Sequence, residues 1–320
     1  MPIPHGWYFV SYSEDLEKEK SKPLSYFDTE LVLYRTNKGD PVLMEAYCPH
    51  MGAHLGHGIH ENIGYGGPVT GENISCPFHG WTFSKDGYVV DIPYADKIPQ
   101  KVEGKKCIKT FPLREVNTTI MAWYHPEGKD PIWEPDVYEE VINPNWTDFD
   151  KYEYKFKAHL QETAENGADS AHFVYVHGTA SLPEWDFSYK EHVRTGVMKA
   201  KMPTPKGVVD GAINILGSGP GQSATRFTGI CETFLMGLPT PINAEEMELR
   251  FAFCQEKESN SKPKGGLGAA IISDINKQVK EDIPIWENKK YLENPILCSK
   301  DGPIAGFRRW FKQFYSQPYS

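Results

Sequence analysis

The sequence lacks the features that would direct a protein into a membrane or a secretory route. No apolar run reaches the length needed to cross a bilayer, since the run Leu267 to Ile272 is short and flanked by glycine. The opening, Met1 to Trp7, does not show the basic and then apolar pattern of a signal peptide. The six cysteines are not closely paired, which argues against a disulfide framework. These absences predict a cytoplasmic protein.

An excess of basic residues is also missing. The chain has 34 Lys and Arg against 43 Asp and Glu, and its net charge of −9 argues against nucleic acid as the main partner. It contains no internal repeat and no low-complexity tract. The glycines at 217, 219 and 221 do not lie in a strand–turn–helix context, so they do not indicate a nucleotide-binding loop.

What is present is sufficient for a large core. The 320 residues are 39% hydrophobic and 13% aromatic, which predicts one large domain or two modest ones. Strand-like runs dominate the first part, and Asp86-Gly87 lies between two of them as the turn of a tight hairpin. The proline-rich, acidic stretch 126–144 has no periodicity and is the best candidate for a linker. We therefore predict two domains, 1–140 and 141–320.

The second part mixes strands and helices. Residues 152–159 suit a strand, 160–177 have helical composition, 193–253 are mostly strand-like, and 271–315 are helical. The predicted fold class is therefore α+β, with an all-β N-terminal domain followed by an antiparallel sheet with helices.

The most informative feature is a pair of short motifs. Cys48-Pro-His50 and Cys76-Pro-Phe-His79-Gly-Trp81 each supply one thiolate and one imidazole. Two cysteines and two histidines are the ligands of a Rieske [2Fe–2S] cluster, and the same four residues could bind structural zinc. Zinc fingers usually keep cysteine with cysteine and histidine with histidine. Because each motif here mixes the two types, the spacing favours the cluster.

A second group of possible ligands lies at residues 162–177. Asp169 and His172 are three residues apart and would share a helix face. His177 would lie about 140° further round an ideal helix, so both imidazoles reach one metal only if the helix ends or bulges between them. Gly178 suits such an end. The alternative is two ordinary core histidines, but an electron donor upstream implies an acceptor downstream.

Non-haem Fe(II) held by two histidines and one carboxylate is the natural acceptor. The carboxylate must come from elsewhere in the chain. Asp274, Glu281 and Asp282 are the candidates, and the pattern alone does not choose among them.

These motifs together resemble the Rieske non-haem iron oxygenases, specifically their oxygenase (α) component. The resemblance extends over nearly the whole chain and is most similar to the 3-ketosteroid 9α-hydroxylase oxygenases and the cholesterol 7-desaturases. The matching segments are residues 5–7, 46–52, 76–81, 91–95, 165–177, 281–289, 294–297 and 301–315.

The resemblance implies a role for individual residues. Cys48 and Cys76 would hold one iron of the cluster, and His50 and His79 would hold the other. The mononuclear iron would be bound by His172, His177 and Asp282, with Asn166 beside it. Asp169 would be a bridging carboxylate between His172 and a cluster histidine of a neighbouring subunit. The catalytic domain would then have a helix-grip-like fold, and the protein would be a homotrimer.

The resemblance also implies an activity. The protein would be a monooxygenase that uses O₂ and electrons passed from NAD(P)H by a separate reductase, with or without a ferredoxin, to oxidise a C–H bond of an apolar substrate. A steroid or sterol is the leading substrate class, and a smaller polycyclic or heterocyclic compound is the alternative. Two alternatives come from other functional classes, a pure Rieske electron carrier and a zinc-stabilised binding module. Neither would use the second group of possible ligands at residues 162–177.

One segment departs from the family pattern. The separation of 25 residues between His50 and Cys76 is longer than usual, and residues 60–67 are expected to bulge from the first domain. His54, His57 and His60 lie near the cluster motifs, where we interpret them as surface or supporting residues and not as ligands.

Overall fold

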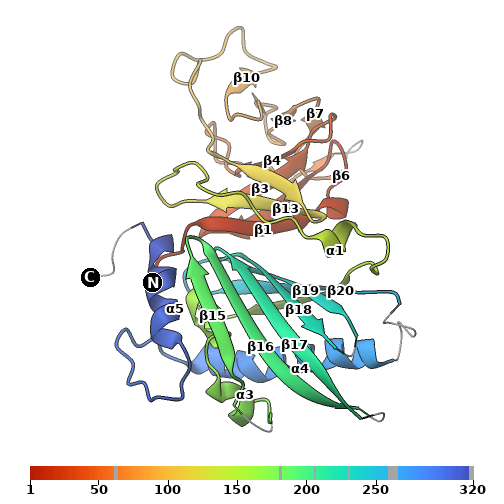
Figure 1. Ribbon diagram of the computed structural model, residues 1–320. Helices are drawn as coiled ribbons and strands as arrows, with labels where there is room; N and C mark the ends of the chain where they lie inside the picture. The colour runs from red at the N-terminus through yellow and green to blue at the C-terminus, as the bar shows by residue number, and fades with distance from the viewer. Residues whose placement is uncertain (61–63, 180–181, 205–206, 230, 259–265, 317–320) are drawn as a thin grey trace. The chain divides into compact units, whose positions relative to one another are not determined.

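The computed structural model covers residues 1–320 and describes all of them except 61–63, 180–181, 205–206, 230, 259–265 and 317–320 (Figure 1). The chain divides into two compact units. One, here called the N-terminal unit, is Phe9–Ile132. The other, the C-terminal unit, combines Met1–Tyr8 with Trp133–Ser320. The predicted domain boundary at residue 140 stays a prediction.

The N-terminal unit is built from small antiparallel sheets, to which β1 contributes the part from Phe9 onwards. Their strand orders are β11-β4-β3-β2, β10-β9-β8-β7, β1-β13-β12 and β5-β6. The bounds are β1 (Gly6–Tyr12), η1 (Ser13–Asp15), β2 (Ser21–Tyr26), β3 (Thr29–Arg35), β4 (Pro41–Glu45), β5 (Ile59–His60), β6 (Gly64–Tyr65), β7 (Val69–Thr70), β8 (Asn73–Ser75), β9 (Thr82–Phe83), β10 (Val89–Asp91), β11 (Thr110–Phe111), β12 (Leu113–Val116) and β13 (Thr119–Tyr124).

The core of this unit explains why both cysteine motifs end up together. Cys48 and Cys76 belong to one buried cluster that also contains Leu55, Ile74 and Trp81. The predicted hairpin after the second motif is confirmed as the pair β9 and β10.

Glycine is required in the turn of that hairpin. Gly87 has a φ of +86°, and a Cβ there would lie 2.0 Å from the main-chain oxygen of Ile108. The segment 60–67 contributes to the short hairpin of β5 and β6, and residues 61–63 lie outside the described residues.

The C-terminal unit is organised around one seven-stranded antiparallel sheet with the order β14-β20-β19-β18-β17-β16-β15. Its longest pairing joins β16 and β17 from Val193 opposite Ser218 to Thr204 opposite Gly207. The bounds are α1 (Glu139–Ile142), β14 (Asp150–Phe156), α2 (Leu160–Asn166), α3 (Ala171–Tyr175), β15 (Trp185–Lys190), β16 (Val193–Thr204), β17 (Gly207–Ser218), β18 (Gln222–Thr228), β19 (Thr233–Pro241), β20 (Met247–Gln255), α4 (Leu267–Asn288), α5 (Ile304–Phe311) and η2 (Lys312–Phe314).

Helix α4 lies against one face of this sheet (Figure 1). Ile272 of the helix packs with Leu235 of β19 and Phe253 of β20 in a buried cluster. The alternation of side chains along each strand supplies this apolar face, and the buried positions of α4 recur on one side of the helix.

Two segments predicted as helical are interrupted. Residues 160–177 form the two short helices α2 and α3, because Gly167 ends the first one. Residues 271–315 form α4 and α5 with an irregular stretch between them. The predicted α+β fold class, an all-β unit followed by an antiparallel sheet with helices, is confirmed.

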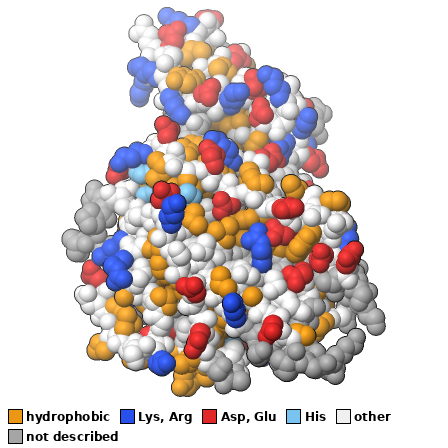
Figure 2. Space-filling view, viewed as in Figure 1, with side chains coloured by type: hydrophobic (Ala, Val, Ile, Leu, Met, Phe, Trp, Pro, Cys, Tyr) orange, Lys and Arg blue, Asp and Glu red, His pale blue; other side chains and the backbone are white. Residues whose placement is uncertain are grey.

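Two surface properties bear on the sequence-based expectations. In the described part of the chain, no helix combines the length and apolar character that crossing a bilayer requires. Acidic and basic side chains are interspersed over the face drawn in Figure 2.

Two candidate metal centres

The two cysteine motifs form loops with the same main-chain hydrogen bonds. In the first loop, Gly52 N donates to Cys48 O at 2.9 Å and Cys48 N donates to Ala53 O at 2.9 Å. In the second, Gly80 N donates to Cys76 O at 2.9 Å and Cys76 N donates to Trp81 O at 2.8 Å. Both glycines have positive φ, +76° and +72°, which permits the tight return of each loop.

This repeated geometry brings the two thiols together. Cys48 and Cys76 are buried, and their side chains share a hydrogen bond. That bond lowers the pKa of Cys76 to about 6 and raises that of Cys48. Two main-chain N–H groups from the turn after each cysteine also donate to its sulfur, His50 and Met51 to Cys48 and Phe78 and His79 to Cys76, and they favour the thiolate form. A pair of thiols held in this way fits one iron of an iron–sulfur cluster.

The two imidazoles of the loops lie side by side as well. The ring centroids of His50 and His79 are 4.9 Å apart. Trp81 stacks on His50 at 4.8 Å with an interplanar angle of 5°, and its Nε1 donates to Tyr94 Oη at 2.8 Å. The cysteines are buried while both histidines are partly exposed, so an iron held by the imidazoles would lie nearer to solvent. The donor set therefore fits a two-iron cluster with unlike ends.

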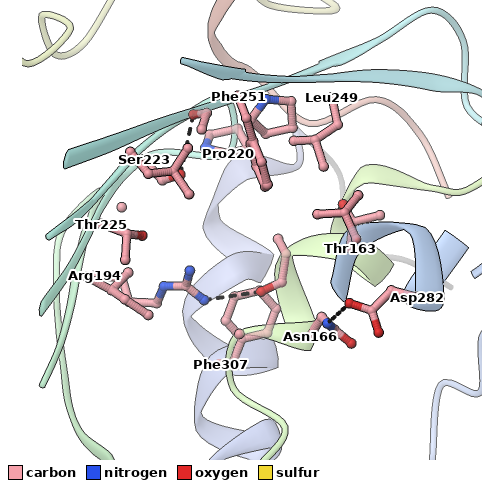
Figure 3. Close-up of a pocket in the computed structure, with 18 of the residues that line it drawn as sticks. Thr163, Asn166, Arg194, Pro220, Ser223, Thr225, Leu249, Phe251, Asp282 and Phe307 are labelled. Atoms are coloured by element: carbon pink, nitrogen blue, oxygen red, sulfur yellow. Dashed lines mark hydrogen bonds between the residues drawn. The ribbon is translucent and has the colours of Figure 1, made fainter. Parts of the chain in front are cut away.

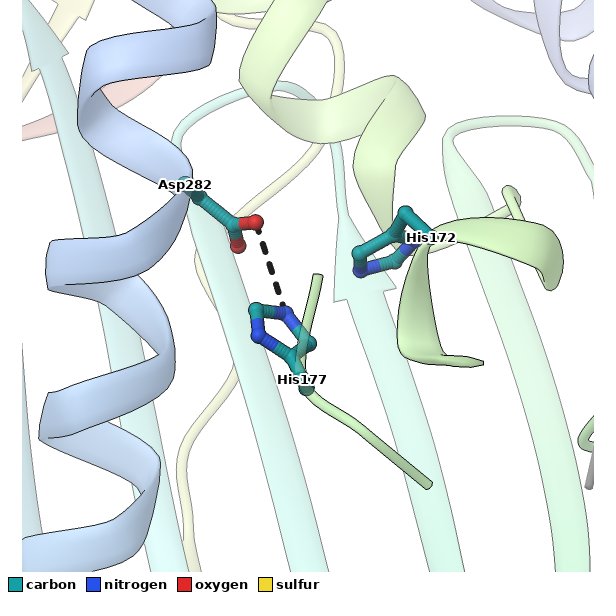
Figure 4. A group of neighbouring side chains, drawn as sticks. All are labelled: His172, His177 and Asp282. Carbon is teal, nitrogen blue, oxygen red and sulfur yellow. Dashed lines mark ion pairs between the residues drawn. The ribbon is translucent and has the colours of Figure 1, made fainter. Parts of the chain in front are cut away.

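A second group of ligand atoms gathers in the C-terminal unit (Figure 4). One atom each from His172, His177 and Asp282 can be chosen so that all three lie within 4.8 Å of one another. His172 comes from α3, Asp282 from α4, and His177 follows the end of α3 at Tyr175. The helix ends between the two histidines, as their spacing required, and Gly178 has a φ of +70°.

Hydrogen bonds fix the tautomer of both histidines. His172 Nδ1 lies 2.6 Å from the main-chain oxygen of Asp169, which can only accept, so Nδ1 carries the proton. His177 Nδ1 lies 3.1 Å from Glu281 Oε2. Both rings thus direct the lone pair of Nε2 towards the space that they share with Asp282, which is the form that binds a metal.

The electrostatics of this group favour a cation. The Asp282 side chain is 8% exposed, and burial raises its pKa to about 6. Burial also lowers the pKa of His172, which favours its neutral imidazole. A divalent metal ion would offset the cost of burying the carboxylate, and two imidazoles with one carboxylate suit Fe(II) with open positions.

The structure distinguishes the three candidate carboxylates. Asp282 faces the histidines, with Oδ1 at 3.4 Å from His177 Nε2. Glu281 instead contacts the far nitrogen of His177, a supporting role that the sequence analysis missed. Asp274 is exposed and accepts a hydrogen bond from Gln278 Nε2 at 2.9 Å. No local signal marks Glu281, because its partner is more than 100 residues away in the chain.

The two remaining predicted residues also lie at this group. Asn166 Nδ2 is 3.1 Å from His172 Nε2 and 3.0 Å from Asp282 Oδ2. The carboxylate of Asp169 was expected to bond His172 Nδ1, but that contact comes from its main-chain oxygen. Because Asp169 precedes α3, its carboxylate accepts from Ala171 N at 3.0 Å instead.

A cavity of about 270 Å³ extends from these residues under the sheet (Figure 3). Apolar side chains such as Ile215, Leu249 and Phe251 form much of its wall. Arg194, from β16, is the basic residue that lines it, and Ser223 and Thr225 are polar neighbours on β18.

A larger cavity of about 1080 Å³ adjoins the first one. The two share wall residues, among them Phe173, Ile215 and Gln278. Leu182, Met198 and Phe227 add apolar surface to the larger cavity. These common residues place the larger cavity directly beside the one that the His172, His177 and Asp282 group lines.

Comparisons with known proteins cover both units. Residues 6–112 match the Rieske [2Fe-2S] domain family, and residues 122–315 match the family described as 3-Ketosteroid 9alpha-hydroxylase C-terminal domain.

Individual relatives align over almost the whole chain. A cholesterol 7-desaturase of Xenopus laevis is 31% identical over 98% of this chain and 72% of its own length. A probable 3-ketosteroid-9-alpha-monooxygenase oxygenase component of Rhodococcus rhodochrous is 28% identical over 97% of this chain and 79% of its own length. The solved structure of dicamba monooxygenase bound to 3,6-dichlorosalicylic acid superposes with a TM-score of 0.77 at 21% identity, covering 97% of this chain and 96% of that one.

Proposed function

The chain belongs to the Rieske non-haem iron oxygenases with a 3-ketosteroid 9α-hydroxylase-type C-terminal domain, and on this premise we propose that it oxidises a C–H bond of a steroid-like substrate. It is an oxidoreductase, and its cofactors are a Rieske [2Fe–2S] cluster and mononuclear iron. When bound, the cluster supplies single electrons and the mononuclear iron activates O₂ for attack on the substrate.

For the ligands, we propose Cys48 and Cys76 on one cluster iron and His50 and His79 on the other. The shared thiol hydrogen bond and the 4.9 Å between the imidazoles support this assignment. The mononuclear iron is assigned to the group His172, His177 and Asp282. Its single strongest support is that both imidazoles direct Nε2 towards one buried carboxylate.

The residues of the C-terminal unit then have separate tasks. Asp169 O and Glu281 orient the two imidazoles and hold the proton on Nδ1. Asn166 donates to Asp282 and keeps its carboxylate in place. The apolar cavity walls position the substrate and exclude water, so that oxidation is directed at the substrate carbon.

The steroid-like substrate is inferred from the relatives and from the cavity. The named relatives act on cholesterol or on 3-ketosteroids, and they align over nearly the whole chain. The two cavities share wall residues and are lined largely by apolar side chains, which suits such a substrate. We propose hydroxylation, because the replacement of one hydrogen atom by a hydroxyl group is the simplest oxidation of a C–H bond.

A smaller polycyclic or heterocyclic substrate is the second candidate. The inner cavity of about 270 Å³ favours it, because this volume lies at the lower limit for ligand sites. A pure electron carrier would not need the second group of ligands or the cavity beside it.

We further propose that electrons come from NAD(P)H through a separate reductase. The relatives named as oxygenase components support the need for such a partner.

A homotrimer, in which Asp169 meets a cluster histidine of a neighbouring subunit, is also proposed. Exposed apolar side chains beside the cluster loops, Met51, Phe78 and Tyr94, give that end of the N-terminal unit a surface for another chain. The cytoplasmic location stays a prediction.

Turnover tests the proposed function. The purified protein, loaded with both cofactors and supplied with a generic reductase and NADH, should add one oxygen atom to at least one member of a panel of 3-ketosteroids and sterols. Mass spectrometry with ¹⁸O₂ would detect the labelled product. His172→Ala is the matched control and should give none. If only small aromatic or heterocyclic compounds are oxidised, the second candidate replaces the first.

A further inference from the structure

Arg194 is a buried cation in the cavity wall. Arg194 is 8% exposed, and in Figure 3 its guanidinium points from β16 into the cavity. Nη1 donates to Ala164 O at 3.2 Å, and the guanidinium carbon lies 5.3 Å from the ring centre of Phe307. Of these two contacts only the first is a hydrogen bond, so most N–H donors of the guanidinium are not used by it.

The other buried arginines of the described residues each have a counter-charge. Arg35 and Arg250 are also 8% exposed, and each forms an ion pair with a carboxylate. In the part of the chain that the structure describes, Arg194 has no ion pair. A buried charge without a counter-charge is costly, so its persistence in a cavity points to a partner that arrives from outside.

The unused donors lie on one edge of the guanidinium. Nε is buried without a hydrogen-bond partner, and no hydrogen bond among the described residues uses Nη2. The N–H groups of Nε and Nη2 are parallel and spaced to match the two oxygens of a carboxylate. A ketone or hydroxyl oxygen would satisfy only one of them.

Two glycines leave room beside this edge. A Cβ at Gly217 would lie 3.5 Å from Nε, and one at Gly167 would lie 3.6 Å from Nη2. Any side chain at either position would occupy space next to the free donors. Both residues also line the cavity, so a ligand in the cavity can reach this edge.

We propose that the substrate carries a carboxylate, which Arg194 binds through Nε and Nη2 while the apolar body lies against the cavity walls. This inference deepens the proposed function, on which it rests, because it names the group that orients a steroid-like molecule. Arg194 is thereby a specificity-determining residue for the oxidation.

The test compares acids with their methyl esters on two skeletons. The ligands are 3-oxoandrost-4-ene-17β-carboxylic acid and 2-naphthoic acid, each with its methyl ester. Calorimetric titration into the anaerobic protein with both metal centres loaded gives the four affinities. We expect the acid of at least one skeleton to bind about 10- to 100-fold more tightly than its ester, as a charge-assisted pair of hydrogen bonds implies. Arg194→Gln should reduce this ratio to about one.

Two further variants separate the charge from its geometry. Arg194→Lys keeps the charge but loses the two-donor edge, and it should retain only part of the preference for the acid. Gly217→Ala keeps the arginine but fills the space beside Nε, and it should weaken acid binding more than ester binding. Arg194→Met should raise the Tm of the protein without ligand, because it removes an uncompensated buried charge. This last readout does not depend on any ligand.

The possible outcomes distinguish the inference from the proposed function. If the steroid pair binds without an acid preference, the inference is wrong while the steroid assignment stands. If only the naphthalene pair binds and the acid is preferred, the inference stands and the steroid assignment falls. Failure of both acids to bind, or an acid preference that survives in Arg194→Gln, overturns the inference.

Discussion

Asp282 and Asp274 lie on the same helix, α4, but only Asp282 faces the two imidazoles. Asp282→Ala should lose mononuclear iron and turnover and keep the cluster, because the N-terminal unit supplies the cluster residues. Asp274→Ala, an exposed position, should keep both. Iron-to-protein ratios and the EPR signal of the reduced cluster measure the two centres separately. Loss of iron in the Asp274 variant alone would show that the ligand assignment on α4 is wrong.

Glu281 provides a second test at the scale of single residues. Its carboxylate contacts His177 Nδ1 at 3.1 Å and so holds the ring and its tautomer. Glu281→Ala should weaken iron binding by about 10- to 100-fold while the cluster spectrum stays unchanged. Titration of the iron-depleted protein with Fe(II) measures the affinity. Lys277→Ala removes the exposed ion pair of Glu281 and serves as control; equal loss in both variants would assign the effect to the helix surface.

The sequence was informative about residues with local motifs and uninformative about those defined by long-range contacts. The cysteine motifs could be interpreted directly, because each pair of proposed cluster ligands lies within one loop. The choice among Asp274, Glu281 and Asp282 depends on how α4 packs against α3, which periodicity does not specify. Arg194 gave no signal at all, because a single arginine in a strand reveals neither its burial nor its lack of a counter-charge.

Among the elements, α5 and α2 are joined by a partly buried ion pair. Arg308 donates from Nε and Nη2 to the carboxylate of Glu165 at 2.6 and 2.8 Å. Glu165 immediately precedes Asn166, so the pair fixes the helix that carries the amide beside Asp282. The carboxylate also holds the pKa of Arg308 above its usual value.

Glu165→Gln should therefore destabilise the C-terminal unit by about 1 to 3 kcal/mol, since it leaves the partly buried Arg308 without its charge partner. Thermal unfolding followed by circular dichroism measures the effect. The double variant Glu165→Gln with Arg308→Gln should recover part of the loss. Lys155→Gln, which breaks an exposed pair with Glu246, is the control and should change little. Additive losses in the double variant would show that the two residues act independently.

Element types were easier to predict than element limits. The strands of 193–253 were expected from their composition and form β16 to β20. The segment 160–177 was expected to be helical, with an end or bulge between His172 and His177, but a further break at Gly167 divides it and places Asp169 before α3. That break is the physical reason why the main-chain oxygen of Asp169 contacts His172 Nδ1, while its carboxylate accepts from main-chain N–H groups at the start of α3.

For the whole molecule, the proposed trimer predicts that electrons pass between subunits. Subunits with Cys76→Ser lack the cluster and subunits with His172→Ala lack the mononuclear iron, so neither should be active alone. Co-expressed with different affinity tags and purified through both, mixed trimers should regain part of the wild-type activity. A mixture of the separately purified proteins under conditions without subunit exchange is the control. Mixed trimers that contain both centres and stay inactive would place electron transfer within one chain.

The walls of the substrate cavity come from two kinds of element, and this has a consequence for remodelling the protein. Val279 and Trp286 line the cavity from α4, about one turn to either side of Asp282, so a change of volume there would displace the carboxylate as well. Ile215, Thr225 and Leu249 line it from the sheet, whose strands carry none of the three proposed iron ligands. A library intended to broaden the range of accepted compounds should therefore vary the strand positions first and leave the helix untouched.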